Sequence, residues 1–207
     1  RISDRMRLGE TIFADHFQFL QSTCAAGVTP KLTIPSPSMV HYRGGRAAID
    51  RAVYPDMEGF WDDLIAAYQD EVTRLGELGC TYLQLDDTAW SMICDPKERA
   101  HSKTRGDDPD TLPALYAKVT NAALAAKPAD MAITMHSCRG NFRSTWLAQG
   151  GYEFVAEHLL GNTNLDGYFL EYDSERAGGF EPLRFFPKGN KQLVLGLVTS
   201  KSGRLEP

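Results

Sequence analysis

The segment Met131-Ala-Ile-Thr-Met-His-Ser-Cys138 places a histidine and a cysteine two residues apart at the end of an apolar run. Residues i and i+2 of a β-strand project to the same face of a sheet, so the His136 imidazole and the Cys138 thiol are expected to point to one spot. An imidazole and a thiolate together suit a borderline-soft cation such as zinc. This segment therefore predicts a strand that ends in two metal-binding donors.

Two other segments follow the same pattern. The run Asp-Gly-Tyr-Phe-Leu-Glu-Tyr at residues 166–172 carries Glu171 near its end, and the run Cys-Thr-Tyr-Leu-Gln-Leu-Asp-Asp at residues 80–87 ends in two carboxylates. Polar groups at the carboxyl ends of successive strands are typical of parallel α/β enzymes, whose chemistry takes place at that edge. Asp86 and Asp87 are adjacent and face opposite ways in a strand, so only one of them, by prediction Asp86, faces the site.

Helical and strand-like segments alternate along the whole chain. Apolar residues at helical spacing predict helices over residues 11–26, 57–78, 111–126, 151–160 and, more briefly, 181–185. Strand-like runs lie at residues 31–35, 80–86, 131–136, 166–171 and 192–199. Residues 88–110 are expected to form a long charged loop. Such alternation predicts an α/β fold with a parallel sheet.

Five strands are fewer than a closed (β/α)8 barrel needs, although an open doubly wound sheet can form with five. Polar strand ends recur on four successive strands, which favours the barrel, because an open sheet concentrates its ligand at one switch point. The chain is therefore expected to be a single catalytic barrel domain over residues 1–207, with about five βα units. It opens without Met and closes directly after a strand-like segment, so both ends are expected to be cuts that omit the first strands and the last strand.

Composition narrows the class of protein. A formal net charge of -5 offers no basic surface for nucleic acid, and no apolar stretch approaches the ~20 residues of a membrane helix. The four cysteines are scattered and are expected to be free thiols in a reducing cytoplasm. These features predict a cytoplasmic enzyme that acts on small molecules, with no nucleic-acid or membrane partner.

Four motifs occur in an order that resembles the cobalamin-independent methionine synthases, and more closely single-barrel relatives of that family's C-terminal domain. They are Thr33-Ile-Pro-Ser-Pro-Ser38, Leu83-Gln-Leu-Asp-Asp87, His136-Ser-Cys-Arg-Gly-Asn141 and Leu170-Glu-Tyr172. The resemblance covers nearly the whole chain, and its most specific part is the His-x-Cys pair followed by a strand-end Glu. It implies a (β/α)8 TIM barrel in which zinc is held by His136, Cys138, Glu171 and a second Cys on a strand that this chain does not contain.

The resemblance also implies a reaction, the S-methylation of homocysteine to methionine. Asp86 matches the aspartate that binds the homocysteine amino group, and Lys201 aligns with the family's proton-donor His. His41 stands where the synthases place a Trp that stacks on the pterin, and Met92 stands where they place a folate-binding Glu. The resemblance therefore implies the zinc and thiol half of the site but not the folate half, and it does not specify the methyl donor.

Further residues near these motifs are candidates for the same site. Ser36 in the first motif, His41 shortly after it and Trp90 just beyond Asp86 are expected to contact the substrate, although a core position for Trp90 is an equal alternative. Arg139 and Asn141 follow the metal pair and could orient its ligands through hydrogen bonds, or serve as ordinary loop residues. Beyond Glu171, Asp173 and Arg176 are expected to form a surface salt bridge. Cys94 is a weak alternative for the fourth zinc ligand.

Three other functions remain open. The zinc-activated thiol could be a different one, such as coenzyme M attacking an epoxide. A metal-free barrel hydrolase could use Asp86 and Glu171 as an acid/base pair, although His136 and Cys138 would then have no role. An inactive paralogue could keep zinc for structure alone, in a closed site with four protein ligands.

Overall fold

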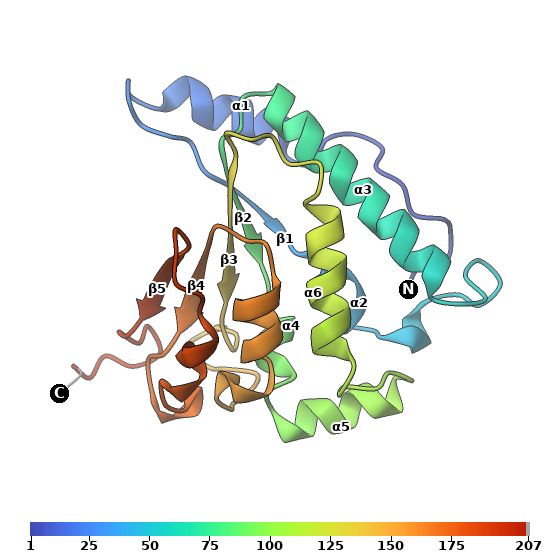
Figure 1. Ribbon diagram of the computed structural model, residues 1–207, viewed down its shortest axis with the longest axis vertical. Coiled ribbons are helices and arrows are strands. Elements are labelled where there is room, and N and C mark those ends of the chain that lie inside the picture. The colour runs from blue at the N-terminus through green and yellow to red at the C-terminus, as the bar shows by residue number, and fades with distance from the viewer. Residues whose placement is uncertain (206–207) are drawn as a thin grey trace.

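A computed structural model describes residues 1–205 of the chain, and its centre is a parallel sheet (Figure 1). Its strands are β1 (Leu32–Pro35), β2 (Tyr82–Asp86), β3 (Ala132–Ser137), β4 (Gly167–Glu171) and β5 (Gln192–Gly196). They lie in the order β1-β2-β3-β4-β5, so each strand pairs in parallel with the next one along the chain. In a doubly wound sheet the strand order reverses at a switch point, whereas the strand order here runs in one direction throughout. The fold is α/β with a five-stranded parallel sheet, compatible with part of a TIM-barrel-like fold.

Helices connect the strands. The α-helices are α1 (Ala14–Thr23), α2 (Pro37–Tyr42), α3 (Glu58–Glu77), α4 (Ala89–Met92), α5 (Pro96–Thr104) and α6 (Leu112–Ala123). The shorter turns are the 3-10 helices η1 (Arg46–Ala48), η2 (Tyr152–Phe154), η4 (Glu175–Ala177) and η5 (Glu181–Phe185), and the π-helical turn η3 (Glu157–Gly161). In Figure 1, α3 and α6 run along one face of the sheet, and the strands point toward the end where α4 and α5 lie. Among residues 1–205, no helix is both long and apolar enough to span a membrane.

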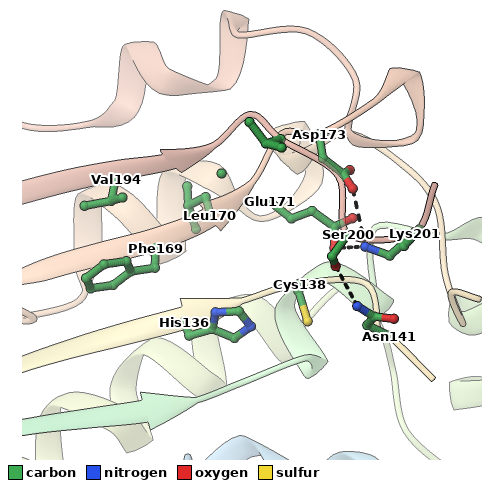
Figure 2. Close-up of a pocket in the computed structure, with 12 residues that line it drawn as sticks. His136, Cys138, Asn141, Phe169, Leu170, Glu171, Asp173, Val194, Ser200 and Lys201 are labelled. Carbon is green, nitrogen blue, oxygen red and sulfur yellow. Dashed lines mark hydrogen bonds and ion pairs between the residues drawn. The ribbon is translucent and has the colours of Figure 1, made fainter. Parts of the chain in front are cut away.

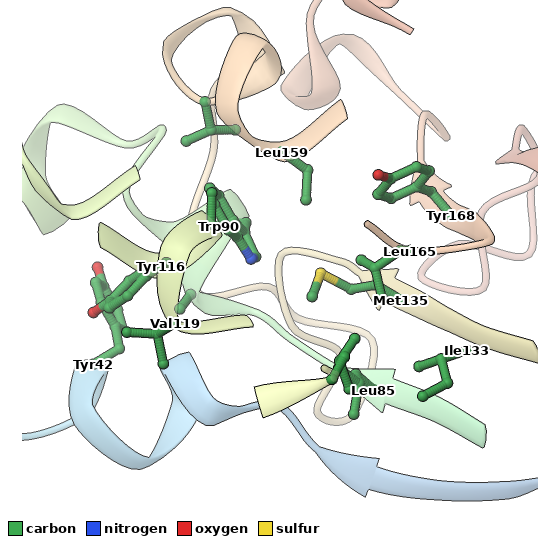
Figure 3. Close-up of a cluster of buried hydrophobic side chains, with 14 of the residues drawn as sticks. Tyr42, Leu85, Trp90, Tyr116, Val119, Ile133, Met135, Leu159, Leu165 and Tyr168 are labelled. Atoms are coloured by element: carbon green, nitrogen blue, oxygen red, sulfur yellow. The ribbon is translucent and has the colours of Figure 1, made fainter. Parts of the chain in front are cut away.

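The two faces of the sheet differ in burial. One set of alternate strand residues, which includes Leu85, Ile133 and Tyr168, is fully buried in the core together with residues of α6 (Figure 3). The intervening set, which includes Gln84 and His136, is only partly buried. Burial of alternate residues follows from the period of two along a strand. The sheet therefore packs one face against the helices, whereas the less buried opposite face carries polar residues together with Phe169 and Val194.

Most of the predicted elements are confirmed, and the exceptions have physical reasons. The predicted loop over residues 88–110 is wrong, because α4 and α5 lie within it. Helix α5 begins at a strong start signal: the Asp95 side chain accepts a hydrogen bond from the Lys97 amide at 2.8 Å, and Pro96 occupies the first turn. The residues that follow are too charged to show apolar periodicity. The predicted helix over residues 151–160 is instead divided between η2 and η3.

Candidate functional site

A pocket of about 390 Å³ opens where β3, β4 and β5 end (Figure 2). Its lining includes all three predicted zinc ligands, His136, Cys138 and Glu171. Along the strands the wall is apolar, formed by Phe169, Leu170, Val194, Gly196 and Val198, and beyond the strand ends it is polar, formed by Asn141, Asp173, Ser200 and Lys201. The sheet therefore presents a pocket of mixed character at the edge where parallel α/β proteins perform chemistry.

Strand register explains why the three side chains line the same pocket. Ser137 pairs with Leu170 across β3 and β4, so Cys138 and Glu171, each one residue further along, leave the sheet side by side. On the α4 side, the Ser91 hydroxyl donates to the Cys138 carbonyl and ties this loop down. Burial raises the pKa of the Cys138 thiol above its ordinary value, although the Gly140 amide and the Lys201 ammonium lower it in part. The thiol is therefore mainly protonated at neutral pH unless a bound cation favours the thiolate.

The Glu171 carboxylate lies in a cluster of cations. Its Oε2 accepts hydrogen bonds from the Arg139 backbone N–H at 3.2 Å and from Lys201 Nζ at 3.3 Å. Its Oε1 accepts from Arg176 Nη1, also at 3.3 Å. Asp173 shares two of these cations, since it lies 3.4 Å from Lys201 Nζ and 3.1 Å from Arg176 Nη2. Two carboxylates and three cations therefore form a largely buried charge cluster beside the pocket.

The predicted ligands are of a kind that zinc takes, but they are not gathered into a metal cluster in this structure. Among residues 1–205, no three His, Cys, Asp or Glu side chains are grouped closely enough to hold a metal ion. His136, Cys138 and Glu171 nevertheless line one pocket from adjoining strands, and imidazole, thiolate and carboxylate are the donors that zinc takes in proteins. Since Glu171 is engaged by Lys201 and Arg176, its carboxylate would have to turn from these cations to reach a metal.

Asp86 and Lys201 lie at or beside this pocket. Asp86 is exposed at the end of β2, where it pairs in register with His136 and accepts a 2.7 Å hydrogen bond from Gln84 Nε2. It does not line the pocket, but its charge acts on the Cys138 thiol. Lys201 does line the pocket, with its ammonium facing Glu171 and Asp173 (Figure 2).

The structure does not bring Ser36, His41 or Trp90 to the pocket. All three are buried, and Trp90 lies in the core beside Tyr116 (Figure 3). His41 Nδ1 lies 2.9 Å from the Tyr116 hydroxyl, within an aromatic cluster. The substrate contacts predicted for these residues are therefore not supported by their placement.

Ser36 faces away from the pocket because its hydroxyl binds the buried carboxylate of Asp87. The Ser36 and Ser38 hydroxyls both donate to the Asp87 carboxylate, which is fully buried and also accepts from the backbone amides of Ala89 and Trp90. Burial raises the pKa of the Asp87 carboxyl, whereas its four hydrogen bonds favour the charged form. Asp87 thus joins the start of α2 to the start of α4 and turns the Ser36 side chain to the helix side of the sheet.

The prediction that Asp173 and Arg176 lie at the surface is wrong. The predicted pair of Asp173 and Arg176 does form, but their side chains are only 4% and 12% exposed, and Asp173 lines the pocket. A signal for this lies in the spacing, since Asp173 follows Glu171 by two residues, as Cys138 follows His136. The link between this pair and Lys201 joins distant parts of the chain, which no local pattern reveals.

Relatives of this chain exist among curated proteins, although no protein-family model matches it. It is 50% identical over 203 residues to the uncharacterized protein YxjH of Bacillus subtilis (strain 168). It is 47% identical over 204 residues to YxjG of the same organism. Each match covers 96% of this chain and 53% of the relative, so the chain spans about half the length of these curated proteins.

Solved structures share the fold. One, from Listeria monocytogenes, is described as a "putative vitamin-B12 independent methionine synthase"; it is 40% identical with a TM-score of 0.80, over 99% of this chain and 57% of that one. Another, a B12-independent methionine synthase from Shewanella sp. W3-18-1 in complex with selenomethionine, has a TM-score of 0.59 at 14% identity, over 92% of this chain and 60% of that one, and shows the fold alone. The chain is thus similar in sequence and fold to a protein described as a "putative vitamin-B12 independent methionine synthase", and it shares its fold with a second protein named as a B12-independent methionine synthase.

Proposed function

We propose that this chain forms much of the catalytic barrel of a zinc-dependent thiol methyltransferase, which converts homocysteine to methionine. The observation that supports it best is the convergence of His136, Cys138 and Glu171 on one pocket at the ends of adjoining parallel strands. The barrel would be a (β/α)8 barrel of which these five strands form a part, and the length of the relatives leaves room for the others.

Each residue has a role that follows from its position. Zinc held by His136, Cys138 and Glu171 would lower the pKa of a substrate thiol, ordinarily ~8.5, so that the sulfur attacks the methyl group as a thiolate. Asp86, one strand away from His136, would accept hydrogen bonds from the substrate ammonium group. Lys201 would donate a proton to the departing donor from the polar side of the pocket. Phe169 and Val194 would pack against the substrate methylenes and exclude water.

The rival hydrolase finds less support in the geometry. A hydrolase needs its two carboxyl groups to flank the scissile bond. Glu171 lines the pocket, but Asp86 is exposed outside it. Asp86 and Glu171 therefore do not face a common pocket in which they could act as an acid/base pair.

We expect the methyl donor to be simpler than polyglutamylated methyltetrahydrofolate. His41 and Met92, which take the places of the pterin-stacking Trp and the folate-binding Glu, are both buried outside the pocket and offer no surface to a pterin. Steady-state assays of the full-length protein with homocysteine and each candidate donor test this, with His136→Ala as the inactive control. Efficient turnover with the folate donor would show that the pterin binds to other residues, and no turnover with any donor would argue against the proposed function.

A further inference from the structure

We infer that Arg139 is a positioning residue, which fixes the Glu171 carboxylate next to Cys138 so that both can serve one cation. The inference rests on the proposed function, in which both residues bind zinc. Arg139 itself does not line the pocket, so it would act through Glu171 rather than on the metal or the substrate.

The Arg139 side chain is locked in place. Its guanidinium is 0% exposed and donates to the Gly150 carbonyl from Nε at 3.0 Å and from Nη2 at 2.6 Å. The same group lies over the Tyr152 ring, 4.5 Å from the centroid, and the Tyr152 hydroxyl donates to the Ser137 carbonyl. The planar guanidinium thus ties the end of β3 to the far end of the loop that follows it. A residue held by this many contacts has little freedom to shift when the pocket is occupied.

Arg139 also contacts Glu171 at three points, through two hydrogen bonds and one ion pair. Its backbone N–H donates to Oε2 at 3.2 Å, Nη1 donates to the Glu171 carbonyl at 3.1 Å, and Nη1 lies 3.6 Å from Oε1. Because Arg139 directly follows Cys138, its backbone N–H belongs to the peptide group that links the two residues. Arg139 therefore links Glu171 directly to the peptide unit of Cys138, whereas Lys201 and Arg176 hold the Glu171 carboxylate from other segments.

Arg139 differs from the other two cations at Glu171. Arg176 and Lys201 are each shared with Asp173, so either can leave Glu171 and keep a carboxylate partner. Within residues 1–205, Glu171 is the one carboxylate within ion-pair distance of Arg139. Separating them would leave a buried, uncompensated guanidinium, which is strongly unfavourable. When Glu171 turns to a metal, we therefore expect Lys201 and Arg176 to yield and Arg139 to stay.

Arg139→Lys in the full-length protein tests the inference, because lysine keeps the charge but cannot reproduce the forked contacts. After metal removal, the zinc affinity is measured by competition with a chromophoric chelator, and the ligand geometry by the visible spectrum of the cobalt(II) form. We expect roughly ten- to a hundredfold weaker zinc binding, as for loss of a partner of a metal ligand, and an altered cobalt spectrum.

Arg99→Lys is the matched control. Arg99 also donates to backbone carbonyls, those of Ile93 and Cys94, and lies over an aromatic ring, that of Phe154, but it has no contact with Glu171. Both substitutions are expected to lower the melting temperature, whereas only Arg139→Lys should weaken zinc binding. Unchanged zinc affinity and cobalt spectrum in folded Arg139→Lys would overturn the inference while leaving the proposed function intact. A wild-type protein that binds no zinc would overturn both.

A second pair of variants decides the matter if Arg139→Lys does not fold. Tyr152→Leu removes the ring beneath the guanidinium, and Tyr152→Phe keeps that ring. We expect Tyr152→Leu to weaken zinc binding about threefold or more, from the loss of a cation–π contact, with Tyr152→Phe close to wild type. Equal zinc affinities for the two variants would contradict a positioning role for Arg139.

Discussion

Cys138→Ala is expected to abolish methyl transfer and to weaken zinc binding by about a hundredfold or more. Zinc sites with four protein ligands bind with roughly 10–16 kcal/mol, so one ligand accounts for about 3 kcal/mol, which corresponds to that factor. Cys138 is the predicted sulfur ligand in the pocket, and alanine offers no donor in its place. Zinc content after dialysis and methyl transfer to homocysteine, measured on the same preparation, provide the check.

Cys94→Ala is the matched control for this experiment. Cys94 is buried outside the pocket, its thiol donates to the Trp90 carbonyl at 3.3 Å, and burial raises its pKa to about 12. Such a thiol is not poised to bind a metal, so zinc and activity should persist. If Cys94→Ala lost zinc and Cys138→Ala retained it, the sulfur ligand would be Cys94 and the proposed role of Cys138 would be wrong.

Asp86→Asn is expected to weaken homocysteine binding roughly ten- to a hundredfold and to leave the zinc content unchanged. The lost interaction is a charge-assisted hydrogen bond to the substrate ammonium, worth about 1.5–3 kcal/mol. Asp86 is exposed at the end of β2 and its strand partner is His136, so a thiol bound at zinc could reach it with its amino group. The KM for homocysteine and the zinc stoichiometry of the variant measure the two effects separately.

The same variant discriminates between acceptor thiols. Thiols without an amino group should be nearly indifferent to Asp86→Asn, because they offer Asp86 no charge. If Asp86→Asn bound homocysteine as tightly as the wild type, Asp86 would not bind the substrate amino group. The result would favour an acceptor thiol that lacks an amino group. If the substitution removed zinc, Asp86 would belong among the metal ligands instead.

Local patterns predicted the sheet and the edge of the sheet at which His136, Cys138 and Glu171 line one pocket. A strand has a period of two, so the spacing of His136 and Cys138 determines that both reach one face, and the structure places both in the pocket. The apolar runs likewise marked all five strands of the parallel sheet. The sequence near each apolar run is therefore enough to predict where the strand ends and which face its last residues occupy.

Loop residues were harder to place, because their direction depends on distant partners. Ser36 belongs to a motif near the strand end, yet its hydroxyl turns to Asp87, a residue 51 positions away. The charge cluster also brings Arg139 and Lys201 to Glu171, from positions 32 and 30 residues away. No spacing rule connects residues so far apart, so these contacts could only be found in three dimensions.

The most direct test of the zinc proposal is X-ray absorption at the zinc edge of the full-length protein, combined with anomalous diffraction to locate the metal. The proposal predicts one zinc in the pocket, ~2.3 Å from Cys138 Sγ, ~2.0–2.1 Å from a His136 nitrogen and ~2.0–2.2 Å from a Glu171 oxygen. Zinc bound elsewhere would contradict the proposal. Zinc bound in the pocket but not coordinated by Cys138 and Glu171 would contradict it as well.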